Sequence, residues 1–250
     1  MKGIDNRGGT PATTGRALLV AGGLCALAGL AGYLIDMAVF MGETRNFTPG
    51  GSGAAAWFAA LADNPGLALR DLGLINMAAL ILMIPVYAAA AFLHGRERAA
   101  VSALALAFGV AGAAAYISVN PALPLFGLGE KFLATQDEVR RSALVAAGEA
   151  LLARGEDFTV GAFPAFLLGE LAMLTLSLQM SGSRAFGRVA PFLGLLGSLI
   201  LIATTFAMTF TPAIATSAMY LSAIGGLASM AWYGFVAFHL LRPRKGPVTA

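Results

Sequence analysis

Six long apolar runs constrain this sequence more than any other feature. They cover about residues 17–41, 67–93, 99–119, 158–180, 189–210 and 213–241. Each run meets the requirement of ~20 residues for crossing the ~30 Å hydrocarbon core of a bilayer. Backbone groups in lipid must find their hydrogen bonds within the protein, so these runs predict helices rather than open strands. We expect an all-α polytopic bundle of six transmembrane helices, forming a single domain over 17–241.

The composition supports lipid as the solvent of this chain. Hydrophobic residues make up 58% of the 250 residues and charged residues only 12%, whereas soluble domains average about 25% charged residues. The formal net charge of +3 does not indicate nucleic-acid binding, because the basic residues stand at the ends of apolar runs. The single cysteine, Cys25, excludes a disulfide within the chain and a cysteine-based metal cluster. No metal site is predicted.

Basic residues predict how the chain is oriented in the membrane. The short connections 94–98 and 181–188 are basic, and short basic loops stay in the cytoplasm. With the N-terminus inside, ten of the 16 Lys and Arg residues lie on the cytoplasmic side: Lys2, Arg7, Arg16, Arg96, Arg98, Arg184, Arg188, Arg242, Arg244 and Lys245. We therefore expect a multi-pass protein of the cell inner membrane with cytoplasmic tails at 1–16 and 242–250.

The two longer connections, at about 42–66 and 120–157, then lie outside. In the first, Trp57 and Phe58 predict a short interfacial helix, and Asn64 followed by Pro65 is typical of a helix start. In the second, apolar residues at helical spacing predict a short extracytoplasmic amphipathic helix over 136–154. Thr135 and Glu138 match a capping box at its start. This helix is either a scaffold element, a lid over a substrate, or a docking surface for a partner.

Glu170 is the strongest chemical signal in the chain. It lies 12 residues into the fourth run, and no Lys or Arg occurs at a comparable depth in any run. Carboxylates at such depth are costly and commonly functional. Burial disfavours the charged form, so a neutral carboxyl is expected, suited to carrying a proton or donating a hydrogen bond to a ligand. The alternative is a neutral side chain bonded to a neighbouring polar group or to a carbonyl freed by Pro164.

Other polar residues fall in the outer halves of the runs. If they face inward with Glu170, they line an outward-facing polar pocket with Glu170 at its floor; the candidates are Asp36, Asn76, Tyr116, Asn120 and Thr205. Each can instead make an interhelical hydrogen bond. Asp36 has a further alternative, an ion pair with Arg70 or Arg45 on the same side.

The two histidines, His94 and His239, stand at the cytoplasmic ends of their runs. Membrane histidines on different helices can ligate haem, whereas a histidine at a helix end can bond the last carbonyls. We expect capping and no resident cofactor, with haem as the alternative. No phosphate-binding loop, dinucleotide motif or hydrolase motif is present, so an enzyme is less expected than a binding protein.

Three stretches resemble a known family. They are 71–76 (DLGLIN) at the start of the second run, 149–151 (EAL) in the outer helix, and 180–188 (MSGSRAFGR) followed by Pro191 and Gly194. With these the whole chain resembles the bacterial six-helix membrane proteins of domain-of-unknown-function family 4386. The resemblance implies six spans and one domain, and it supplies no activity or catalytic residues.

Three functions remain open from the sequence. The first is a protein that binds or passes a small lipophilic or protonatable ligand, or protons, through the pocket around Glu170. The second is a membrane partner or sensor subunit that docks through the 136–154 helix. The third is a haem-binding or redox membrane protein that uses the two histidines. The sequence fixes neither the ligand nor the oligomeric state.

Overall fold

The computed structural model describes residues 11–42, 53–94, 98–183 and 185–243, and throughout these ranges the chain is helical with no strand. The helices follow one another in the order α1 (Pro11–Gly42), α2 (Ala54–Asp63), α3 (Pro65–Asp71), α4 (Leu74–His94), α5 (Ala99–Val119), α6 (Ala122–Ala134), α7 (Glu138–Gly155), α8 (Phe163–Ser181), α9 (Val189–Phe210), the 3₁₀ turn η2 (Pro212–Ile214) and α10 (Ala215–Leu241). Much of both terminal tails, with Lys2, Arg7, Arg244 and Lys245, lies outside the described residues, as do Arg45, Arg96 and Arg184.

Six of these segments are long and apolar enough to cross a membrane. The expected all-α membrane fold is confirmed. One candidate segment joins α5 to α6 over 36 residues, which corresponds to roughly 54 Å of helix and exceeds a ~30 Å hydrocarbon core. A single span therefore needs only α5, and α6 continues beyond it.

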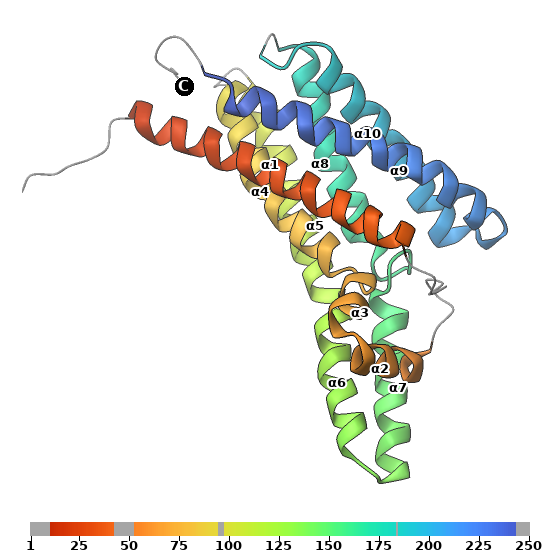
Figure 1. Ribbon diagram of the computed structural model, residues 1–250. Helices are drawn as coiled ribbons and strands as arrows, with labels where there is room; N and C mark the ends of the chain where they lie inside the picture. Colours follow the sequence, from red (N-terminus) through yellow and green to blue (C-terminus); the bar gives the residue numbers. More distant parts are fainter. Residues whose placement is uncertain (1–10, 43–52, 95–97, 184, 244–250) are drawn as a thin grey trace, which may run out of the picture.

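The six spanning helices form a closed ring. Each packs on its neighbour in the order α1, α4, α5, α8, α9 and α10, and α10 returns to pack on α1. The first residues of α1 and the last residues of α10 lie at the same end of the bundle, which we call the terminal end (Figure 1). Helices α6 and α7 project from the opposite end as an antiparallel pair, with α2 and α3 beside them (Figure 1).

We call α2, α3, α6 and α7 the cap. Its small core joins the four helices through Trp57, Phe58, Leu72, Leu125 and Leu152, all buried. The expected short helix around Trp57 is present as α2, and its two aromatic side chains pack into this core. The expectation of a loop before α7 was wrong, because residues 122–134 form the helix α6.

A separate core fills the terminal half of the bundle. Its largest fully buried members include Val86, Leu176, Phe186 and Trp232. At this end α5 and α8 are joined by polar contacts: Arg98 Nη1 donates to the Gln179 carbonyl at 2.7 Å, and Gln179 Nε2 donates to Ser102 Oγ at 2.6 Å. On the outside, the ring exposes large apolar side chains suited to lipid, among them Leu24, Leu34, Val110, Ile117, Phe192, Leu199 and Leu227.

The expected boundaries hold for α5 and α9, and they need correction at three other spans. Helix α1 begins at Pro11, before the expected start at residue 17. The second run is interrupted at Gly73, whose φ of +84° ends α3 and starts α4 in a new direction. A Cβ at Gly73 would lie against the Tyr116 hydroxyl. The fourth run begins with a turn over 158–162, so α8 starts only at Phe163. Apolar loop residues made both runs look longer than their helices.

The helix-start signals had mixed outcomes. The Asn64 side chain accepts from Leu67 N at 3.1 Å, as expected of an N-cap. The capping box at Thr135 was wrong: Asp137 caps α7 by accepting from Val139 N at 3.0 Å. Because α7 packs along α6 and α2, it is part of the projecting cap, and it does not lie over the mouth of the bundle.

Candidate functional site: a cavity and a polar network at the cap end

A cavity of about 220 Å³ lies inside the ring, on the cap side of the buried core. Its walls come from α1, α4, α8, α9 and α10, together with Phe158 of the turn before α8. Helix α5 contributes no wall residue, because its backbone packs closely on α8 where Gly112 meets Gly169. On α4 the lining extends from Asn76 to Tyr87, which corresponds to roughly 16 Å along the helix.

Glu170 faces this cavity from α8. The side chain is partly exposed because it lines the cavity, whereas its Oε2 atom is buried and has no hydrogen-bond partner among the described residues. The true start of α8 places Glu170 seven residues into its helix, roughly 10 Å from that end. The expected depth of 12 residues was therefore too large, and Glu170 lies on a wall of the cavity with Tyr87 and Tyr233 deeper in the bundle.

Of the other pocket candidates, Asn76 and Thr205 line the cavity with Glu170. Asp36, Tyr116 and Asn120 do not. These three lie in polar contacts at the joint between the bundle and the cap. The single pocket that the sequence suggested is thus divided into a cavity and an adjoining network, and Asn76 takes part in both.

The network centres on Asp157, in the turn before α8. Tyr116 Oη donates to Asp157 Oδ1 at 2.7 Å, and Asn76 Nδ2 donates to Asp157 Oδ2 at 3.1 Å. Asn120 Nδ2 donates to the Leu72 carbonyl at 2.9 Å, where the α3–α4 break frees it. One carboxylate therefore ties the start of α8 to α4 and α5.

Burial raises the pKa of Asp157 to about 6. The hydrogen bonds from Tyr116 and Asn76 oppose this rise, and the Glu156 and Asp36 carboxylates add to it. Asp157 was not among the predicted site residues, because it stands in a connection. A usable signal was present, because two hydrogen-bond donors on the same side, Asn76 and Tyr116, needed an acceptor.

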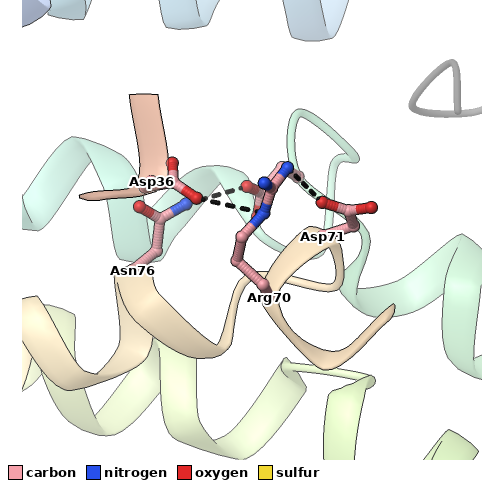
Figure 2. A network of polar contacts seen from close by, with 5 residues as sticks. Asp36, Arg70, Asp71 and Asn76 are labelled. Carbon is pink, nitrogen blue, oxygen red and sulfur yellow. Dashed lines mark hydrogen bonds and ion pairs between the residues drawn. The ribbon is translucent and has the colours of Figure 1, made fainter. Parts of the chain in front are cut away.

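Asp36 of α1 forms the ion pair with Arg70 that was one of its expected alternatives. Arg70 Nε lies 3.3 Å from Asp36 Oδ1, and Arg70 Nη2 lies 2.5 Å from Asp71 Oδ1. Figure 2 shows this cluster beside Asn76, so the ion pairs and the Asp157 network share one end of the bundle.

A distorted residue separates the network from the cavity. Phe158 has a φ of +65°, a conformation that bulky residues seldom adopt. Its ring stacks on Phe166 with centroids 5.8 Å apart, and Phe166 in turn contacts the ring of Tyr116 at 5.3 Å. The Asp157 hydrogen bonds hold the residue before it. Phe158 is thereby held across the cap end of the cavity that it lines.

The histidines make the helix-end contacts expected of capping groups. His94 Nδ1 lies 2.7 Å from the Ala90 carbonyl oxygen, and His239 Nδ1 lies 2.6 Å from that of Phe235. Both rings contact the buried ring of Phe186, at centroid distances of 5.6 and 5.7 Å. Within the described residues, no group of three or more His, Cys, Asp or Glu side chains is placed to hold a metal ion. The haem alternative gains no support from this geometry.

Comparison with protein-family models, with curated proteins and with solved structures gives no match for this chain. The resemblance to domain-of-unknown-function family 4386 stays a prediction, as does the docking of a partner through α7. The fold itself defines the class: the chain is a multi-pass integral membrane protein built as a helical bundle.

Proposed function

We propose that this membrane protein binds or passes a small, largely apolar ligand, or a proton, through the cavity inside the ring, with Glu170 as the central polar contact. The observation that carries the proposal is the Glu170 carboxyl group, which faces a cavity of about 220 Å³ with its Oε2 atom buried and unpaired. Buried polar groups normally have partners. A cavity of about 150 Å³ is enough to hold benzene, so this one is large enough for a substituted ring.

We propose that the ligand enters from the cap end. Asn76, Phe158 and Ser222 line that end of the cavity, whereas the other end adjoins the closely packed core around Trp232. With both termini in the cytoplasm of an inner-membrane protein, the cap lies outside and the cavity is reached from the outer side. Binding is favoured over catalysis because no pair of nucleophile and base converges on Glu170 among the described lining residues.

Two glycines make a matched test of this proposal. A Cβ at Gly226, on the cavity wall, meets nothing within 4 Å, and the same is true at Gly127 on α6 in the cap. Gly226→Leu fills the cavity without a backbone clash, and Gly127→Leu adds the same side chain elsewhere. The probes are neopentylbenzene and benzyltrimethylammonium, measured by equilibrium dialysis against protein in lipid nanodiscs. We expect at least one probe to bind the unaltered protein and Gly127→Leu, and Gly226→Leu to lose about tenfold or more in affinity.

Two outcomes would contradict the proposal. If neither probe binds the unaltered protein, or if Gly226→Leu binds both as well as Gly127→Leu does, the cavity is not a ligand site.

The orientation has its own test. Val139 is 80% exposed at the tip of the cap, so a Cys25→Ser, Val139→Cys variant carries one exposed thiol. We expect a membrane-impermeant maleimide to label this thiol in intact cells. Labelling only after the inner membrane is broken would place the cap in the cytoplasm and reverse the proposed side of entry.

A further inference from the structure

The cavity surrounds one carboxyl group with aromatic rings. Tyr33 of α1, Tyr87 of α4 and Tyr233 of α10 line it together with Glu170. The rings of Tyr33 and Tyr233 meet edge to face at 5.8 Å between centroids. Aromatic faces attract cations, most strongly where water is excluded. The lining therefore offers a carboxylate and several ring faces to the same small volume.

The charges of the lining favour one sign of ligand. Among the described lining residues, Glu170 is the only acidic group, and there is no Lys, Arg or His. An anion would meet no positive charge there. A cation would supply the partner that Oε2 lacks, and intramembrane carboxylates are usually paired.

Flexible, polarizable side chains form much of the remaining lining. Four methionines contribute to it: Met83, Met173, Met208 and Met230. Flexible thioether side chains adjust to irregular apolar shapes and also contact aromatic groups favourably. The wall thus suits a ligand with an apolar body around or beside its charge.

We propose that the ligand of this cavity is a small lipophilic organic cation, an ammonium compound whose charge lies against the Glu170 carboxylate among the tyrosine rings. This inference rests on the proposed function, because it names the chemical class of the ligand that the cavity takes. The available volume limits the ligand to about the size of a substituted benzene.

Binding of such a cation is linked to a proton. A proton and the cation compete for the same Glu170 carboxylate oxygens, so a proton bound there must leave to solvent as the cation enters. Among the described lining residues, the other titratable groups are Tyr33, Tyr87 and Tyr233, whose phenols stay neutral near pH 7. Asp157 lies outside the lining, in the adjoining network. The cation therefore binds more tightly as pH rises, and a neutral ligand of the same shape does not.

The two probes defined above separate charge from shape. Benzyltrimethylammonium and neopentylbenzene differ by a positively charged nitrogen in place of a carbon. The variants are Glu170→Gln, which removes the charge in the cavity, and Glu130→Gln, which removes the same charge from an exposed position on α6. In equilibrium dialysis we expect Glu170→Gln to raise the Kd of the cation about tenfold or more. The Kd of the neutral probe should change less than about twofold, and Glu130→Gln should change neither.

The outcomes distinguish the two proposals. If the neutral probe binds in a Gly226-dependent manner and the cation is insensitive to Glu170→Gln, the cation inference falls and the proposed function stands. If neither probe binds, both fall. Should Glu170→Gln fail to fold, a pH series on the unaltered protein decides: the Kd of the cation should fall between pH 5 and 8, and a flat profile overturns the inference.

Discussion

The bundle and the cap distribute their apolar and charged side chains in opposite ways. The cap buries Trp57, Phe58 and Leu125 and exposes most of its charged residues, as a water-soluble domain does. The bundle exposes large apolar side chains such as Phe192, which is 62% exposed, and faces Glu170 to its interior. Two glutamates show the difference. Glu149 of the cap accepts from Ala54 N at 2.6 Å, whereas Glu170 Oε2 has no partner among the described residues. A paired carboxylate stabilises local structure, and an unpaired one is available to a ligand.

The largest effect is expected from deleting the core of the cap. Phe58 is 0% exposed and contacts the ring of Phe132 at 5.1 Å between centroids. Phe58→Ala should lower the free energy of unfolding by about 3–5 kcal/mol, because it loses transfer energy and leaves a void. Phe192→Ala on the lipid face should change it by less than about 0.5 kcal/mol. Thermal unfolding in nanodiscs measures both variants. Equal losses of unfolding free energy would contradict the assignment of the cap to water and of the bundle surface to lipid.

A charge placed on each outer surface tests the same division. Val110 lies at the centre of α5 and is 44% exposed, and Val139 of the cap is 80% exposed. Val110→Arg should raise the apparent free energy of membrane insertion by about 2.5–3.5 kcal/mol. Val139→Arg should leave it unchanged. The check is a glycosylation-based insertion assay, and tolerance of both substitutions would show that α5 does not face lipid there.

The Asp157 network, where the bundle meets the cap, should make the stability of the protein depend on pH. Folded Asp157 takes up its proton near pH 6, above its ordinary value of 3.8. The folded protein therefore binds more protons than the unfolded chain between about pH 4 and 6, so its stability is greatest below this window and declines as pH rises through it. The decline is at most about 3 kcal/mol, and partial solvent exposure reduces it.

Asp157→Asn should abolish this part of the pH dependence of stability. Tyr116→Phe should weaken the same hydrogen-bond network. The measurement is the unfolding midpoint at pH 4, 5, 6 and 7. A decline of the same size in Asp157→Asn would assign it to another group.

The smallest effect is expected at the paired glutamate. Glu149→Gln removes the negative charge from the acceptor of the Ala54 N hydrogen bond at the start of α2 and should cost about 0.3–1 kcal/mol. Glu130→Gln, exposed on α6, is the control with no expected cost. If the two variants are equally stable, the charge of Glu149 at the start of α2 contributes nothing measurable.

The fold was largely predictable because long apolar runs have few structural solutions. The turns at Gly73 and Phe158 were not predictable, because apolar residues continue through them and hydropathy does not register backbone direction. Helix α6 was missed for a related reason: its side chains are apolar enough for a membrane, yet they pack on the cap. Glu170, Asn76 and Thr205, which the sequence suggested as residues of one pocket, line one cavity; their role in binding stays a prediction. Tyr116 is separate from them because it donates to Asp157, and Asn120 because it donates to the Leu72 carbonyl; both acceptors depend on turns that hydropathy does not show.

The closure of the ring has a consequence for how the protein is made. Cavity walls come from α8, α9 and α10, and α10 completes the ring by packing on α1. During synthesis α8 leaves the ribosome before α9 and α10, so Glu170 enters the membrane while its cavity is still open to lipid on that side. The neutral form of the carboxyl group is the one suited to this stage. The cavity is enclosed only once α10 has packed on α1, so the docking of α10 is a requirement for an enclosed cavity.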